Sequence, residues 1–487
     1  MNVSIIGDMN RKNFLHLTGL FGVGGLFGAA AGCASPSPSG SGADADATAA
    51  TDLAAKVIAA GIDGSVFDLA CEALPRVRVA VFGLGNRGQG LIDMLAWLVS
   101  QGHAEITALS DINPTKIDKA LAQIAGFQSA VPAIFTGSAE AWKEAMGVEV
   151  ADLALICTPW ELHTPMALAA MRAGLHAASE VPIAYTPDDC IALVRTAEET
   201  QRHCIMLENC CYNGEELGLL RMIEEGVFGT LTHAECAYLH DLRALMLDPT
   251  YYEDRWRLKH HLQRDGNLYT THGLGPVCMY FDILRGDRLT HLVSMSSREA
   301  ALSEALAGSD DPELQAMASA VRCGDVNTTL IGTASGKSIM LQFDTHVGRP
   351  YNRLNKVIGS KAVHYGYPSR LYVDHGPTWD WHGWLDEGAS AEMRDRYAHP
   401  LWSRLQALAA EHEQGHGGMD FVMMYRLIRA LNEGVSLDLN VYDGALWSLV
   451  GALSEESVAK GSEKVGVPDL TAGRWKTKRP HPVNRPF

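Results

Sequence analysis

Residues 77–88 read VRVAVFGLGNRG, a β-branched apolar run that ends in three spaced glycines. Residues 91–99 then show the apolar spacing of a helix. A Gly-x-Gly-x-x-Gly motif between a strand and a helix is typical of a turn that binds the pyrophosphate of a dinucleotide. Gly83 permits the turn, Gly85 lets the backbone approach the phosphates, and Gly88 lets the helix pack on the strand. The free N–H groups at the helix start favour the negative phosphates.

An acidic residue follows the next predicted strand. Residues 105–109 form that strand and Asp111 comes shortly after it, where a carboxylate is expected to bind the ribose hydroxyls. No Arg follows within residues 111–114, which favours NAD over NADP. The alternative is that Asp111 only caps the following helix.

The alternation of strands and helices continues along the first half of the chain. Strands are expected at 152–157, 176–180 and 203–207, with helices at 163–173 and 187–202. This pattern predicts a doubly wound parallel sheet, a Rossmann domain, over residues 75–210. Ligands of such sheets bind beyond the carboxyl ends of the strands. Five residues lie at or just after those ends: Asp111, Trp160, His163, Glu180 and Asn209.

A second domain is expected over residues 211–475. After a helix at 213–225, strand-like stretches occur at 232–239, 289–296, 328–333, 338–343 and 356–358. Their hairpin spacing predicts an α+β domain with an open, mostly antiparallel sheet. Residues 301–323 are expected to form a surface helix or lid, and 417–432 a late helix, followed by a tail at 476–487. The loops are rich in Tyr, His, Arg and Trp, which suit a sugar ring and its hydroxyls.

The first 33 residues have the composition of an export signal. A charged segment with Arg11 and Lys12 precedes a Gly/Ala-rich apolar run, which resembles a twin-arginine signal with Lys in the second position. Residues 30–33 resemble a lipoprotein processing site with Cys33 as the lipidated residue; the alternative is a plain signal peptide. Residues 34–74 are expected to be a linker and extension. The sequence thus predicts an exported periplasmic or cell-envelope lipoprotein, anchored to the membrane through Cys33.

Bulk composition excludes some partners. The formal net charge is −17, which disfavours nucleic acid. The spacing of the ten cysteines resembles no metal site, and we expect no metal and mostly reduced, buried thiols. The expected partners are a small glycan or glycoside and a second copy of the chain in a homo-oligomer.

Long strings from residue 76 to 475 resemble known proteins. The layout resembles the glucose-fructose oxidoreductase/inositol dehydrogenase superfamily, but the superfamily's Glu-Lys-Pro is here Glu180-Val181-Pro182. With this departure, the chain resembles glycoside hydrolase family 109. The strings that carry this likeness are TPWELH (158–163), LENCCY (207–212), AYLHDLR (237–243), WRLKH (256–260), GNLY (266–269), GHGGMDF (415–421) and VYD (441–443).

The resemblance implies an NAD-dependent α-N-acetylgalactosaminidase. It implies that NAD is held, together with the glycine motif, by Asn86, Arg87, Asp111, Trp160, Glu161, Leu162, His163, Glu180, Val181 and Asn209. It implies that the sugar site is lined by Tyr238, Arg257, Tyr269, Thr270, Thr271, His272 and Tyr351. This chain has Tyr269-Thr270-Thr271-His272 where the family has Tyr-Pro-Thr-His, which affects the stiffness of the loop and the substrate preference.

Such an enzyme is expected to cleave glycosides without net redox. Hydride leaves C3 of the sugar for NAD, a base removes the C2 proton, the aglycone leaves from C1, water adds, and the hydride returns. His272 is the expected base, and Tyr269 and Tyr238 are candidate proton donors or acceptors. The alternatives are an exported sugar oxidoreductase with net hydride transfer, which lacks its usual Lys here, and a sugar-binding protein without turnover.

Overall fold

The computed structural model describes residues 52–411 and 416–486, which all belong to one unit of the chain. The expected export signal, Cys33 and the first part of the linker lie outside the described residues. Among the helices that the structure describes, none has the length and apolarity needed to cross a bilayer. The nine described cysteines are free thiols, and seven of them are buried, which confirms the expectation for this part of the chain.

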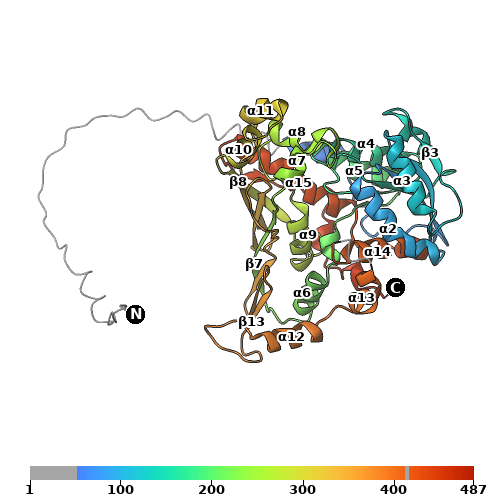
Figure 1. The fold of residues 1–487 in the computed structure, drawn as a ribbon. Coiled ribbons are helices and arrows are strands. Elements are labelled where there is room, and N and C mark those ends of the chain that lie inside the picture. The colour runs from blue at the N-terminus through green and yellow to red at the C-terminus, as the bar shows by residue number, and fades with distance from the viewer. Residues whose placement is uncertain (1–51, 412–415, 487) are drawn as a thin grey trace, which may run out of the picture. The chain divides into compact units, whose positions relative to one another are not determined.

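The first domain contains a six-stranded parallel sheet in the order β3-β2-β1-β4-β5-β6 (Figure 1). Its strands are β1 (Val77–Phe82), β2 (Ala104–Ser110), β3 (Ala133–Phe135), β4 (Leu153–Ile156), β5 (His176–Ser179) and β6 (Cys204–Met206). Its helices are α2 (Asn86–Ser100), α3 (Pro114–Ile124), α4 (Trp160–Arg172) and α5 (Pro187–Thr200). This strand order is that of a doubly wound dinucleotide-binding fold and confirms the predicted Rossmann domain.

The second domain contains an eight-stranded sheet in the order β13-β12-β11-β7-β10-β9-β8-β14. Its strands are β7 (Leu231–Leu239), β8 (Leu289–Ser296), β9 (Asn327–Thr333), β10 (Ser338–Asp344), β11 (Lys356–Gly359), β12 (Ala362–Tyr365), β13 (Arg370–Val373) and β14 (Val465–Gly466). Only β7 and β10 pair in parallel; the other neighbours are antiparallel, as predicted. Burial alternates along β9, so one face of the sheet is covered and the other is open.

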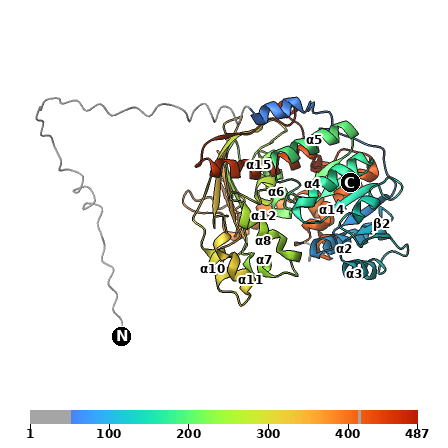
Figure 2. The same ribbon diagram turned by 90° about the horizontal axis from the view of Figure 1, so that it is seen from above.

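Helices cover the inner face of this sheet and connect it to the first domain (Figure 2). The helices after the first domain are α6 (Gly214–Glu224), α7 (Arg243–Leu247), α8 (Trp256–Gln263), α9 (Thr271–Tyr280), α10 (Ala301–Ala307), α11 (Pro312–Met317), α12 (Glu387–Arg396), α13 (Pro400–Glu411), α14 (Met419–Glu433) and α15 (Val441–Ala459). Of these, α9 packs on β7 and α15 on β8. The late helix α14 contacts α2, and α15 contacts both α5 and β8. The C-terminal helices therefore join the two domains.

Candidate active site

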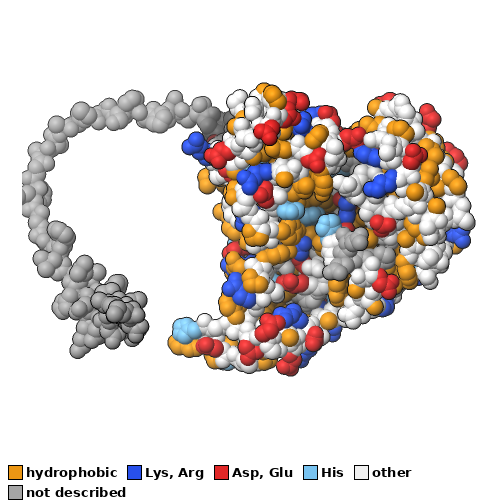
Figure 3. Space-filling view, viewed as in Figure 1, with side chains coloured by type: hydrophobic (Ala, Val, Ile, Leu, Met, Phe, Trp, Pro, Cys, Tyr) orange, Lys and Arg blue, Asp and Glu red, His pale blue; other side chains and the backbone are white. Residues whose placement is uncertain are grey.

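A cavity of about 810 Å³ lies where the carboxyl ends of the first sheet face the second domain. In the space-filling view, histidine side chains gather near the middle of the molecular surface that is shown (Figure 3). Of the predicted nucleotide-binding residues, those that line the cavity are Gly83, Gly85, Asn86, Arg87, Asp111, Trp160, Glu161, Leu162, His163, Glu180, Val181 and Asn209. Tyr238, Arg257, Tyr269 and His272 of the predicted sugar site line the same cavity. The two sets of side chains therefore share one space, as a reaction between cofactor and sugar requires.

The glycine motif leaves room for a dinucleotide at one position and packs tightly at the other two. Gly83 has φ of +83°, and a Cβ there would lie 2.7 Å from the Cys157 carbonyl oxygen. A Cβ on Gly88 would lie 2.0 Å from the Gly83 carbonyl oxygen. A Cβ on Gly85 would meet no atom within 4 Å, because that position faces the cavity. The motif thus fits the pyrophosphate of NAD, which needs close approach to the backbone at the second glycine.

Alanine substitutions should separate these roles. Gly88→Ala should disrupt folding, because its Cβ would clash with backbone. Gly85→Ala should leave the melting temperature of the nucleotide-free protein within a few degrees and weaken NAD binding at least about tenfold, since only the ligand meets the new methyl group. Calorimetric titration with NAD and thermal melts measure both effects. Unchanged NAD affinity in Gly85→Ala would contradict this placement of the phosphates.

Asp111 lies at the end of β2 beside the glycine turn. Its carboxylate accepts hydrogen bonds from the backbone N–H groups of Leu84 (2.7 Å) and Asn113 (2.8 Å). The cap of α3 is Asn113, whose side chain accepts a hydrogen bond from Thr115 N–H. Asp111 is therefore not the helix cap, and its position at the cavity wall suits ribose hydroxyls.

An ionic network joins the start of α2 to the start of α14. Arg87 contacts Asp420 through two nitrogens, at 2.5 and 3.1 Å, and Glu180 at 2.6 Å. Asp420 also accepts from the Asn209 amide at 2.7 Å and lies 2.8 Å from the His416 ring. Burial alone would raise the pKa of Asp420, but Arg87 and His416 outweigh burial and hold this pKa far below its usual range. The network fixes three predicted cofactor-binding residues around a carboxylate from the far end of the chain.

This low pKa makes a prediction for acid stability. Because the folded-state pKa of Asp420 lies below the unfolded-state pKa, its stabilising contribution is complete above about pH 4 and is lost as the pH falls further. Between pH 4 and 3 the wild type should lose about 1 kcal/mol more unfolding free energy than Asp420→Asn. Urea unfolding at the two pH values measures the difference. Equal losses in the two proteins would exclude this role of Asp420.

His163 ties together the loops that follow β4 and β5. Its ring nitrogens lie 2.7 Å from the carbonyl oxygens of Thr158 and Pro182. Burial lowers the pKa of the ring, and a neutral ring donates a hydrogen bond to one of these two oxygens only. The ring thus lies between the loops that carry Trp160, Glu180 and Val181 at the cavity wall. His163 thus acts on the cavity mainly by positioning its neighbours.

Glu208, His272 and Tyr269 form a hydrogen-bonded series at the cavity. The fully buried Glu208 carboxylate contacts His272 Nδ1 with both oxygens, at 2.8 and 3.0 Å. Because an ionised carboxylate only accepts, Nδ1 carries a proton, and Nε2 is the ring nitrogen left to exchange a proton at the cavity. Nε2 lies 3.4 Å from the Tyr269 hydroxyl. Burial would raise the pKa of Glu208, but His272 outweighs it and the pKa is lowered, so the carboxylate stays ionised.

A second phenol–imidazole pair lies against the first. The Tyr238 hydroxyl is 3.0 Å from His240 Nδ1, and the Tyr238 and Tyr269 rings are 4.5 Å apart. Burial raises the pKa of both phenols and lowers that of His240. Both tyrosines are therefore neutral hydroxyls that can donate or relay a proton.

Arg257 is a buried cation without a carboxylate partner among the described residues. Its guanidinium lies 4.9–5.4 Å from the ring centres of Trp160, Tyr252 and Tyr269, and Nη1 donates to the Tyr252 hydroxyl at 3.3 Å. Nε and Nη2 have no hydrogen-bond partner in the described part of the chain. The aromatic rings offset part of the cost of burying the charge. The two unpartnered nitrogens at a cavity wall suit the oxygen atoms of a ligand.

Four predicted site residues lie outside the cavity lining. Gly88 packs beneath the glycine turn, and the Thr270 hydroxyl donates to the Trp447 carbonyl oxygen at 2.5 Å. Thr271 is fully buried at the start of α9. Tyr351 accepts from Arg353 at 3.3 Å, and its ring contacts those of Tyr238 and His240, so it borders the second phenol–imidazole pair. Thr270 and Thr271 thus support the loop that carries Tyr269 and His272.

Sequence reasoning assigned no role to two carboxylates that organise the cavity. Glu208 comes immediately before Asn209 after β6, so the rule that polar residues at strand ends form the site could have found it. Asp420 contacts Arg87 across 333 positions of sequence, and no local pattern indicates such a contact.

Comparisons with known proteins agree with this geometry. Residues 77–208 match the family described as "Oxidoreductase family, NAD-binding Rossmann fold". Residues 212–477 match the family described as "Glycosyl hydrolase 109, C-terminal domain". Levoglucosan dehydrogenase in complex with NADH superposes with a TM-score of 0.60 at 18% identity, covering 81% of this chain and 100% of that one, which shows the shared fold. The protein is therefore an NAD-binding enzyme of the glucose-fructose oxidoreductase/inositol dehydrogenase fold.

Relatives define the family more narrowly. A glycosyl hydrolase family 109 protein of Solibacter usitatus is 44% identical over 410 residues, which cover 83% of this chain and 90% of the relative. One from Shewanella sp. (strain W3-18-1) is 42% identical over 419 residues, with 85% and 90% covered. The chain belongs to glycosyl hydrolase family 109.

Proposed function

We propose that this protein hydrolyses terminal α-N-acetylgalactosaminides by an oxidation, elimination, addition and reduction cycle without net redox. The observation that carries the proposal is the Glu208–His272–Tyr269 series, in which His272 and Tyr269 line the same cavity as the nucleotide-binding residues and Glu208 lies buried behind His272. The sugar itself follows from the family resemblance alone.

Conventional glycosidases place two carboxyl groups on either side of the scissile bond. Here Glu161 pairs with His260, Glu180 pairs with Arg87, and Glu208 pairs with His272. Two other acids near the sugar-site segments, Asp241 and Asp265, do not line the cavity. Asp241 accepts a hydrogen bond from Arg243, and Asp265 accepts one from the Gly324 N–H. The groups beside Arg257 are instead phenols and imidazoles, which favours proton transfer at C2 over direct displacement at C1.

Each residue then has a definite task. NAD, when bound by the residues of the glycine motif and the cavity wall, would supply the hydride acceptor and donor that the cycle needs at C3. His272 Nε2 accepts the C2 proton, while Glu208 fixes the tautomer that makes this possible. The Tyr238 and Tyr269 hydroxyls exchange protons with the sugar hydroxyl and the leaving oxygen. Arg257 donates to sugar oxygens through its two unpartnered nitrogens.

An assay with an aryl N-acetyl-α-galactosaminide tests the proposal. We expect stoichiometric release of aryl alcohol and N-acetylgalactosamine, with NAD required and no accumulation of NADH. Aryl N-acetyl-β-galactosaminide and aryl α-glucoside are the matched controls for anomer and sugar. Oxidised sugar together with stoichiometric NADH would establish the oxidoreductase alternative, and binding without product would establish a sugar-binding protein.

A further inference from the structure

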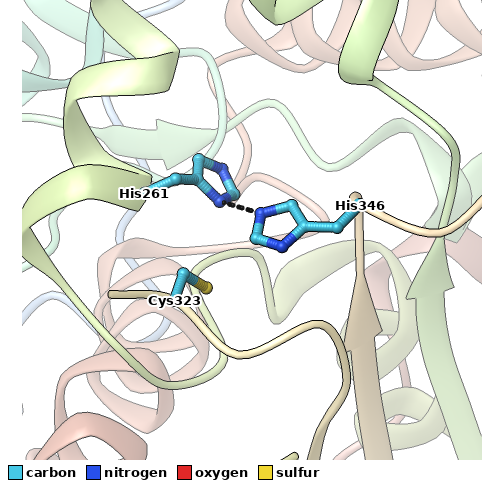
Figure 4. A group of neighbouring side chains, drawn as sticks. All are labelled: His261, Cys323 and His346. Atoms are coloured by element: carbon cyan, nitrogen blue, oxygen red, sulfur yellow. Dashed lines mark hydrogen bonds between the residues drawn. The ribbon is translucent and has the colours of Figure 1, made fainter. Parts of the chain in front are cut away.

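A second cluster of reactive side chains lies away from the cavity, between α8, the segment before β9 and the end of β10. It contains His261, Cys323 and His346, each no more than 1% exposed, with one ligand atom of each within 4.8 Å of the others. Figure 4 shows the two imidazole rings edge to edge and the thiol of Cys323 beside them. We propose that this cluster binds one zinc ion through the two imidazoles and the thiolate.

The backbone holds the three side chains in place. The N–H groups of Arg322 and Cys323 both donate to the His261 carbonyl oxygen at 3.1 Å, which fixes the thiol beside the first ring. On the other side, the Asp344 carboxylate accepts from the N–H groups of His346 and Val347 at 2.9 and 3.0 Å. The site is therefore built before any ion arrives, and little conformational entropy is lost when the ion binds.

The outer contacts orient the imidazoles as in a metal site. His346 Nδ1 makes no hydrogen bond within the described residues, but it lies 3.4 Å from Asp325 Oδ1, and this negative charge favours the proton on Nδ1 and leaves Nε2 as a ligand atom. Nε2 faces His261 Nδ1 at 2.8 Å, and the other nitrogen of His261 is buried without a hydrogen-bond partner among the described residues. The proton that His261 Nδ1 now shares can move to that nitrogen, which frees Nδ1 for the metal.

The distances suit a small tetrahedral ion after a modest adjustment. Zinc–nitrogen bonds of about 2.0–2.1 Å in tetrahedral geometry need ring nitrogens about 3.4 Å apart. The 2.8 Å contact must therefore open by about 0.6 Å, which small rotations of the two rings provide. Binding releases the thiol proton of Cys323 to solvent, and water completes the coordination.

The ion would act on structure and not on the reaction. His261 is on α8, which also carries Arg257, whereas Cys323 follows the insertion that contains α10 and α11. The ion would join α8, the insertion and the end of β10, and so hold Arg257 against the cavity. The order of the segments explains why the sequence showed no metal motif: the ligands are far apart along the chain.

Metal analysis of the full-length protein tests this site independently of glycoside hydrolysis. The protein is stripped with chelator, incubated with one equivalent of Zn²⁺ and desalted before elemental analysis. We expect one zinc per chain in the wild type and in the control Cys236→Ala, which removes another buried thiol of the same domain. Cys323→Ala and His346→Gln should retain none, and Asp325→Asn should weaken affinity about 10- to 100-fold.

Cobalt gives a spectroscopic readout of the ligands. Co²⁺ in place of zinc should show a sulfur-to-metal charge-transfer band that Cys323→Ala abolishes and Cys236→Ala retains. Wild-type protein that retains no zinc, or a Cys323→Ala variant that retains as much as the wild type, would overturn the site. Retention of Cu⁺ in preference to Zn²⁺ would overturn the assignment of the ion. Circular dichroism of Asp325→Asn, the mildest change, checks that lost binding does not reflect misfolding.

Discussion

Glu208→Gln should lower the turnover number by about 10²–10⁴-fold while leaving KM within a few-fold. The amide keeps the size of the side chain but can present an N–H to His272 Nδ1. That contact favours the tautomer with its proton on Nε2, which cannot accept the C2 proton. Steady-state kinetics with an aryl glycoside measure the effect.

A double-mutant cycle distinguishes positioning from general destabilisation. If Glu208 acts only through His272, the double variant Glu208→Gln/His272→Ala should be no slower than His272→Ala, which alone should lose about 10²–10⁴-fold. Multiplicative losses would show that Glu208 acts elsewhere. Full activity in Glu208→Gln would remove His272 as the base.

Arg257→Met should lower kcat/KM by about 10²–10⁴-fold without destabilising the protein. The loss corresponds to two charge-assisted hydrogen bonds to the sugar, each worth about 1.5–3 kcal/mol. In the sugar-free protein the same change removes a buried cation that lacks a carboxylate partner among the described residues, and a methionine keeps the apolar contact with the rings. The unfolding free energy should therefore stay constant or rise by about 1–2 kcal/mol.

The decisive result for Arg257→Met is a fall in kcat/KM without a fall in the unfolding free energy. A structural arginine would lose stability and activity together, whereas a ligand-binding arginine loses activity alone. Arg285→Met is the matched control, because Arg285 is equally buried but forms an ion pair with Asp443 at 2.8 Å through two nitrogens. That variant should lose about 3–5 kcal/mol of stability. A comparable loss in Arg257→Met would contradict the proposed role.

The first domain was predictable because its signals are local. The glycine motif, the β-branched strands and the acid after β2 depend on neighbours in sequence, and the rule for strand ends gathers Trp160, Glu180 and Asn209 at one cavity. Helix α2 begins at Asn86, within the motif itself, earlier than the apolar spacing indicated.

Other features depend on tertiary contacts that no short pattern records. Helix α15 is buried on nearly all sides, so it lacks the polar face that makes a helix recognisable in sequence, although its Asn440–Asp443 capping box marks its start. Asp420 and the His261–Cys323–His346 cluster likewise join segments that are distant along the chain. Chemistry of this kind is visible only once the fold brings the residues together.

Hydrolysis in heavy water tests the proposed mechanism most directly. The C2 proton leaves the sugar during elimination and a solvent proton replaces it, whereas direct displacement at C1 never touches C2. The N-acetylgalactosamine released by the wild type should therefore carry one deuterium at C2 by mass spectrometry and NMR, and substrate deuterated at C2 should lose its label in ordinary water. Cleavage with the C2 hydrogen fully retained would contradict the mechanism and leave NAD without a catalytic part in it.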